Sequence, residues 1–99
     1  MDAAKLTQTE DLILGLLQSG EMYGLEMVHR ANGLLPRGSV YVVLNRMEAK
    51  RLISSRQESR PSGTSGIAKR LYKATAFGAR VHRSFVRKRA AVLGVPATA

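Results

Sequence analysis

The sequence predicts a mainly α-helical domain that carries one small β-hairpin. Apolar residues recur at helical spacing in four segments, and two short alternating segments flank a stretch rich in Gly, Ser and Pro. The chain has 99 residues, of which 44% are hydrophobic. That length and composition suit one compact unit with a small core.

Charge is divided unevenly along the chain. Residues 1–50 contain five Lys/Arg and six Asp/Glu, a net of −1, whereas residues 51–99 contain eleven Lys/Arg and one acid, a net of +10. Such a concentration of positive charge predicts a polyanionic partner, either nucleic acid or an anionic membrane surface. A basic surface that serves only solubility is the plainer alternative.

Several classes of protein are disfavoured by what the sequence lacks. It has no apolar run of 18 residues, no basic segment followed by an apolar one at its start, and no Cys. We therefore expect no membrane span, no secretion signal, and neither disulfides nor thiolate metal sites. A cytoplasmic location fits this composition.

The first helix is expected at about residues 9–19. Thr7-Gln-Thr-Glu10 fits a capping box, in which the Thr7 hydroxyl and the Glu10 carboxylate accept hydrogen bonds from opposite backbone amides. One apolar face follows, made of Leu12, Ile13, Leu16 and Leu17. Gly20 stands where helices commonly end.

A second helix is expected at about residues 23–32, with Leu25 and Val28 facing inward. Gly24 is unfavourable within a helix, so its place near the start indicates close packing against a neighbouring helix. Asn32-Gly33 then breaks the helix.

The third helix lies within residues 37–51. Pro36 suits the first turn of a helix, and the sequence leaves open whether Arg37 or Ser39 is the boundary. A narrow apolar stripe at i, i+4, i+7 is formed by Val40, Leu44 and Met47.

The opposite face of this helix has the chemistry of a DNA major-groove reader. Asn pairs with the adenine edge, Arg with guanine or a phosphate, and a Val methyl packs on the thymine methyl. We predict base reading by Val42, Asn45 and Arg46. We predict phosphate binding by Ser39, Tyr41, Lys50 and Arg51. An ordinary amphipathic helix with a solvated outer face is the alternative.

Two short strands are expected at residues 52–58 and 68–74. Residues 59–66 between them are dense in turn residues, which predicts a hairpin loop rather than the alternative, a flexible linker between domains. The hairpin cations expected to bind phosphates are Arg56, Arg60, Lys69 and Arg70. For Arg56 and Arg70, a simple solvated strand position is the alternative.

Thr75 is expected to cap a last helix at residues 76–93, which Gly94 and Pro96 stop. At about 27 Å the helix is long for so small a domain. One of its faces carries Arg80, Arg83, Arg87 and Arg89. We infer a two-fold dimer through this helix and the first one, with an interface of Leu12, Leu16, Val81, Phe85, Val92 and Leu93. Fraying of the last turns is the alternative.

The order of helices and strands is that of a winged helix-turn-helix, with the 37–51 helix as reader and residues 59–69 as wing. Over about residues 12–80 the chain also resembles the PadR-like family of bacterial transcriptional regulators. The segments that carry the resemblance are Ile13-Leu-Gly-Leu-Leu17, Met22-Tyr-Gly-Leu-Glu-Met27, Gly38-Ser-Val-Tyr41 with Leu44-Asn-Arg-Met47, and Leu71-Tyr-Lys-Ala-Thr-Ala-Phe-Gly78.

This resemblance implies a homodimeric repressor that binds double-stranded DNA at a palindromic operator. It places a winged helix-turn-helix DNA-binding domain at residues 1–75 and a dimerisation helix with its tail at residues 76–99. The chain departs from the family where Val40-Tyr41-Val42 replaces the usual Leu-Tyr-Pro and where Tyr23-Gly-Leu-Glu26 replaces Tyr-Gly-Tyr-Glu. Its C-terminal region is one helix, as in the short members of the family.

Catalysis is not expected. His29 and His82 sit on separate predicted helices, no carboxylate lies at helical spacing from His82, and the loop glycines lack the lysine and helix of a phosphate loop. We expect no metal and no cofactor. A small-molecule effector between the subunits near Phe85 suits some relatives, but nothing in this sequence requires one.

Three other functions compete with DNA reading. The main one is a dimeric winged-helix module that docks on an acidic protein partner. RNA binding is disfavoured because the sequence lacks exposed aromatic stacking pairs. Membrane-surface binding through the Arg-rich last helix is disfavoured because the apolar face of that helix is needed for the dimer.

Overall fold

The computed structural model describes residues 6–58 and 69–94. Its elements are α1 (Gln8–Leu17), β1 (Met22–Tyr23), α2 (Gly24–Ala31), α3 (Val40–Ala49), β2 (Ile53–Gln57), β3 (Arg70–Ala74) and α4 (Ala76–Leu93). The expected fold class is confirmed: a winged helix-turn-helix followed by one long C-terminal helix. The bounds of α4 agree with the prediction. α1 begins one residue before its expected range and ends two residues before its end, α2, α3, β2 and β3 are shorter than their expected ranges, and β1 had no predicted range.

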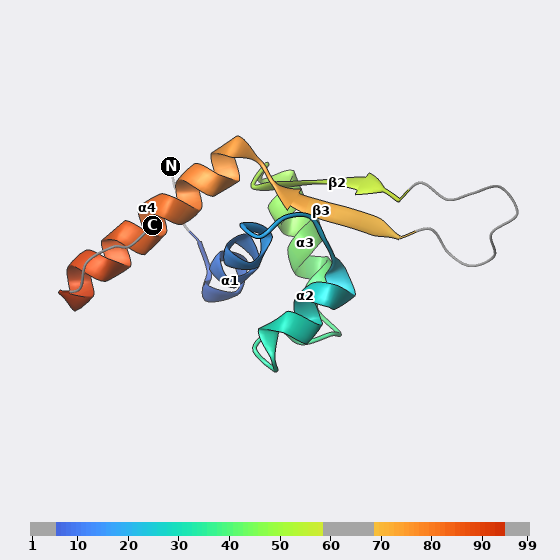
Figure 1. Ribbon diagram of the computed structural model, residues 1–99, viewed down its shortest axis with the longest axis horizontal. Coiled ribbons are helices and arrows are strands. Elements are labelled where there is room, and N and C mark those ends of the chain that lie inside the picture. Colours follow the sequence, from blue (N-terminus) through green and yellow to red (C-terminus); the bar gives the residue numbers. More distant parts are fainter. Residues whose placement is uncertain (1–5, 59–68, 95–99) are drawn as a thin grey trace, which may run out of the picture.

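The three strands form one antiparallel sheet in the order β1-β3-β2. The hairpin pairs Ile53 with Ala74 and Gln57 with Arg70, while β1 adds the pair of Met22 with Tyr72. Figure 1 shows the hairpin leaving the helices on one side and α4 leaving them on the other. The sheet therefore ties the base of the wing to the segment between α1 and α2.

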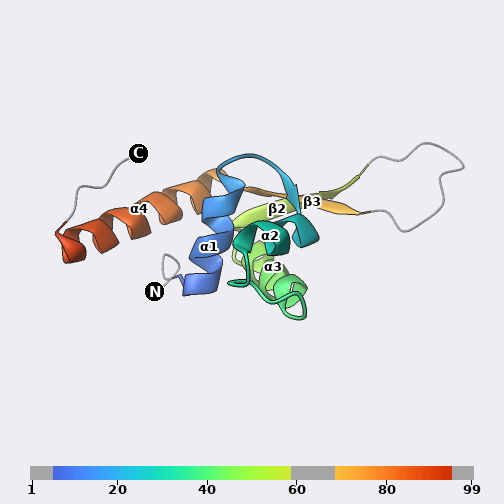
Figure 2. The same ribbon diagram turned by 60° about the horizontal axis from the view of Figure 1, so that its bottom comes forward.

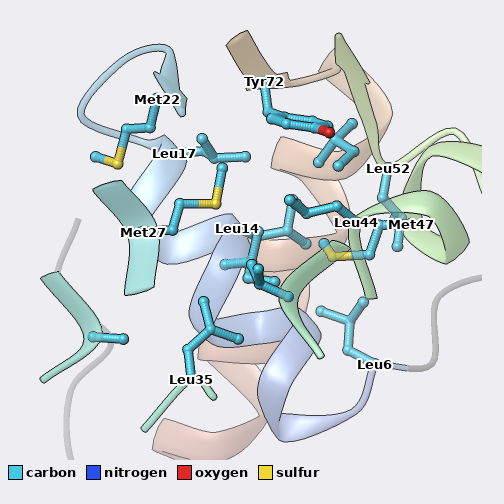
Figure 3. Packing of buried hydrophobic residues seen from close by; sticks show 14 of the residues in the cluster. Leu6, Leu14, Leu17, Met22, Met27, Leu35, Leu44, Met47, Leu52 and Tyr72 are labelled. Atoms are coloured by element: carbon cyan, nitrogen blue, oxygen red, sulfur yellow. The ribbon is translucent and has the colours of Figure 1, made fainter. Parts of the chain in front are cut away.

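One hydrophobic core joins the helices to the sheet. Figure 3 shows Leu14, Met27, Leu44 and Tyr72 converging from different elements, and each is 3% exposed or less. The expected stripe of α3 is confirmed, because its three residues Val40, Leu44 and Met47 are fully buried. This stripe packs α3 onto the core.

The inward position expected for Leu25 is wrong, since this side chain is 40% exposed. The helix begins at Gly24, and Gly24, Met27 and Ala31 are the residues it buries. These positions follow the i, i+3, i+7 spacing of a single helical face, which leaves Leu25 to one side.

Local side-chain caps set the ends of two helices. The capping box of α1 is confirmed, with the Thr7 hydroxyl accepting from the Glu10 amide at 3.1 Å and Glu10 accepting from the Thr7 amide at 3.0 Å. Thr75 caps α4 by accepting from the Gly78 amide at 2.9 Å. Ser39 is the boundary residue of α3, but its side chain makes no capping hydrogen bond.

Candidate nucleic-acid interface

The outer face of α3 is open to solvent. Val42 is 57% exposed, and Asn45 and Arg46 are also exposed. Burial of these side chains would have ruled out base reading, because a groove-reading side chain must reach base edges. Their exposure, on a helix whose other face is packed into the core, leaves the three residues placed as a reading surface requires.

The aromatic ring of Tyr41 lies against the start of α2. A Cβ built on Gly24 would come within 2.8 Å of this ring, which confirms that Gly24 marks close packing between helices. Tyr41 is nevertheless 47% exposed. The prediction that it binds phosphate is compatible with this position at the edge of the helix pair.

Lys50, predicted to bind a DNA phosphate, forms an ion pair within the protein. Its ammonium lies 2.7 Å from a carboxylate oxygen of Glu10, whose side chain is 1% exposed. Burial by itself would raise the pKa of this carboxyl. The hydrogen bonds from Lys50 and the Thr7 amide, with the charges of Lys50 and Arg46, outweigh it and hold the pKa below its ordinary value of 4.5. The C-terminal end of α3 is thereby tied to the N-terminal turn of α1.

The wing cations differ in how freely they can meet a phosphate. Arg56 donates two hydrogen bonds to Glu21, both at 3.0 Å, and Arg70 donates to the Ser55 hydroxyl at 3.0 and 3.1 Å. Lys69 lies 5.4 Å from the centre of the Tyr23 ring. Arg60 lies outside the described residues. Arg56 therefore has a charge partner within the fold, which neither the phosphate-binding prediction nor the solvated-strand alternative included.

Two remaining phosphate candidates flank α3. Ser39 is half-buried at its start, where its hydroxyl donates to the Pro36 carbonyl at 3.4 Å. Arg51 is exposed just past its end and adopts a positive φ of 63°. These two candidates thus lie at the two ends of α3.

The expected dimer residues fall into three groups. Leu12, Leu16 and Phe85 are partly buried against the core, and Val92 and Leu93 are 86% and 67% exposed. Val81 is 5% exposed and belongs to the core of the single chain, on the helix α4 that packs against α1. The Val81 side chain is therefore already buried within one chain and has little surface left for the predicted dimer interface.

An ionic cluster between α1 and α4 escaped the sequence reasoning. Asp11 is 7% exposed, and its carboxylate lies 2.8 Å from His82 Nδ1 and 3.3 Å from Arg89. Helical spacing around His82 does not reveal Asp11, because the two residues are 71 positions apart in the sequence. Arg89, expected on the outer face, is instead turned toward α1.

Neither a metal centre nor a membrane helix emerges from the described segments. Within residues 6–58 and 69–94, no group of three or more metal-ligating side chains comes together. None of the helices described is both long and apolar enough to cross a membrane.

Comparison with known proteins identifies the family. The model of the transcriptional regulator PadR-like family matches residues 13–84. A PadR family transcription regulator from Clostridium difficile is 26% identical, with a TM-score of 0.68, over 89% of this chain and 96% of that one. A PadR-like transcriptional regulator from Bacillus cereus is 25% identical, with a TM-score of 0.68, over 86% and 82% of the two chains. No curated protein matches.

A further similar structure contains DNA. Bacillus subtilis PadR, solved in complex with operator DNA, is 18% identical with a TM-score of 0.69 over 82% of this chain. The match covers 48% of the Bacillus subtilis chain, so only about half of that protein has a counterpart here. The family match extends over most of the sequence, and the chain therefore belongs to the PadR-like family of transcriptional regulators.

Proposed function

We propose that this protein is a sequence-specific repressor that binds double-stranded DNA at a palindromic operator as a homodimer. The proposal rests on the difference in exposure between the two faces of α3. On the inner face, Leu44 and Met47 are fully buried. On the outer face, Val42 is 57% exposed, and Asn45 and Arg46 are exposed beside it. The operator complex of the similarly folded Bacillus subtilis PadR supports the same use of the fold.

The two kinds of contact have separate roles. Val42, Asn45 and Arg46 read base edges in the major groove, which gives sequence preference. Affinity without sequence preference comes from phosphate contacts by Ser39, Tyr41, Arg51, Arg60, Lys69 and Arg70. Lys50 and Arg56, being engaged with Glu10 and Glu21, contribute mainly by holding the surface in shape.

The dimer sets the form of the operator. Two reader helices related by two-fold symmetry require two half-sites about one helical turn, or about 34 Å, apart. The protein acts in the cytoplasm, on the nucleoid when bound, without catalysis or a cofactor. The proposal includes a small-molecule inducer at the dimer interface near Phe85, which a binding screen would identify.

The test begins with selection of bound genomic fragments, followed by affinity measurements on the selected operator and on random duplex. Arg46→Ala should lower operator affinity by about 1–3 kcal/mol and relax preference at one base position. Lys69→Ala should weaken both DNAs alike and lower the salt slope by about 1.

Two results would contradict this assignment. If Arg46→Ala and Lys69→Ala weaken every duplex equally, α3 does not read bases. If the protein binds no duplex at 50 mM salt but binds an acidic protein, the alternative of a protein-interaction module is correct.

A further inference from the structure

A row of arginines follows the outer face of α4. Arg80, Arg83 and Arg87 are all exposed and stand at i, i+3, i+7. Together with Val81 and Ser84 they line an open hollow of about 420 Å³. Their Cα atoms span seven helical steps, about 10.5 Å along the axis, which matches about three 3.4 Å steps of one DNA strand.

The carboxylates that the structure describes are engaged away from this row. Asp11 lies 2.8 Å from His82 and 3.3 Å from Arg89, and Glu21 and Glu26 form ion pairs of 3.0 and 3.3 Å with Arg56 and Arg30. Glu10 holds Lys50, Glu48 accepts from the Ser55 hydroxyl, and Glu58 accepts from the Tyr23 hydroxyl. Within the described segments, no ion pair therefore neutralises the row, and a second copy would bring the same engaged acids.

The row also points away from the reader helix. At about 100° per residue, His82 and Arg89 lie about 160–180° around α4 from Arg80, and about 100–160° from Arg83 and Arg87. Both of those residues contact Asp11 of α1, so the arginine row is on the side of α4 that faces away from α1. Because α1 packs against both α3 and α4, it separates the two cationic surfaces (Figure 2).

We propose that Arg80, Arg83 and Arg87 form a second DNA-binding surface, which takes the backbone phosphates of another duplex segment than the one read by α3. The proposal rests on the proposed function, in that α3 holds the first duplex. Guanidinium groups bind phosphate oxygens without reading bases, so this surface has no sequence preference. The protein would then bridge two stretches of DNA.

The experiment measures capture of a second duplex. The operator is immobilised, the protein is added, and binding of a fluorescent random duplex to the complex is recorded at 50 and 200 mM salt. Three proteins are compared: wild type, R80Q/R83Q/R87Q and the charge-preserving R80K/R83K/R87K. Circular dichroism and sedimentation check that the fold and the oligomeric state are unchanged.

Wild type and the Lys variant should capture the second duplex, more weakly at 200 mM salt. The Gln variant should capture at least tenfold less of the second duplex. Its affinity for the immobilised operator should be unchanged. Equal capture by wild type and the Gln variant would overturn the proposal. So would a loss of operator affinity in the Gln variant, which would place the row on the first duplex, or a change of its oligomeric state, which would place it in the dimer interface. Failure of wild type to bind the immobilised operator would instead reject the proposed function.

Discussion

Gly78 shows how little room the structure leaves at one residue. A Cβ at this position would lie 1.9 Å from the Leu52 carbonyl oxygen and 3.2 Å from a methyl of Leu14. The contact is this close because the Thr75 amide also donates to the Leu52 carbonyl, at 3.1 Å, and so draws the first turn of α4 onto the segment before β2. Only glycine allows α4 to start here.

Gly78→Ala should therefore lower the free energy of unfolding by about 1–3 kcal/mol or more, since the clash is with backbone and cannot be relieved by a rotamer change. Urea denaturation measures the loss. Gly38→Ala is the matched control, because nothing lies within 4 Å of a Cβ built there. Equal losses in the two variants would show that the close approach at Gly78 is not what the substitution disturbs.

The Thr7 hydroxyl is a second residue whose role can be measured. Thr7→Ala removes the acceptor of the Glu10 amide, so the free energy of unfolding should fall by about 1 kcal/mol. Ser39→Ala is the comparison, because the Ser39 side chain makes no capping hydrogen bond at the start of α3. Thermal unfolding should separate the two variants, with Ser39→Ala near wild type. A larger effect at Ser39 would contradict the assignment.

Sequence reasoning succeeded at residues whose partners are close in the chain. Thr7 and Glu10 are three positions apart, so their mutual capping can be read from spacing alone. Asp11 and His82 are 71 positions apart, and their contact depends on how α4 crosses α1. No local pattern encodes that crossing, which is why the Asp11 cluster went unpredicted.

Among the elements, α3 is held partly by a contact 40 residues away in the sequence. Its apolar stripe holds it on the core, and the Lys50–Glu10 ion pair at its C-terminal end adds an electrostatic anchor to α1. α4, by contrast, was predicted with its observed bounds because Thr75 and Gly94 are local start and stop signals. The two-residue β1 carries no such signal, since it exists only through its pairing with β3.

Lys50→Met should lower the free energy of unfolding at pH 7 by about 1–3 kcal/mol, less than for a fully buried pair because the Lys50 side chain is 40% exposed. The folded pKa of Glu10 is lowered from 4.5 in wild type, so its contribution is present above pH 4.5 and is lost as the pH falls through the folded pKa. In the variant, the Thr7 amide and the charge of Arg46 are left to oppose the effect of burial, so the protonated carboxyl is more favoured than in wild type.

The difference between wild type and Lys50→Met should therefore shrink as the pH is lowered from 7 to below 4.5, as measured by urea denaturation at both ends. Arg30→Met is the control, because it breaks an ion pair whose two side chains are 54% and 37% exposed and should change little. A difference that stays constant with pH would show that Lys50 acts through packing and not through the charge of Glu10.

At the scale of the whole molecule, three surfaces face in different directions. The outer face of α3 is on one side of α1, the arginine row of α4 is on the other, and the end of α4 projects beyond α1 (Figure 1). Val92 and Leu93 at this end are 86% and 67% exposed. Two neighbouring apolar side chains left in water at the end of a long helix favour a second subunit over a free helix.

Replacing Val92 and Leu93 together by Glu should convert the proposed dimer into a monomer, because two carboxylates would be buried without partners at the proposed interface. Sedimentation equilibrium should give about twice 10.8 kDa for wild type and 10.8 kDa for the variant. Helical content should not fall, since these side chains contribute little to the core of the single chain. Affinity for a palindromic operator should fall far more than affinity for one half-site, because two linked reader helices bind as one bivalent unit.

Leu34→Glu is the matched control, since Leu34 is also a large apolar side chain, 72% exposed, but lies between α2 and α3. It should leave the dimer intact. A wild type that sediments as a monomer, or a double variant that still sediments as a dimer, would remove α4 from the interface. The two-fold operator would then need another source of symmetry, because one reader helix spans only one half-site.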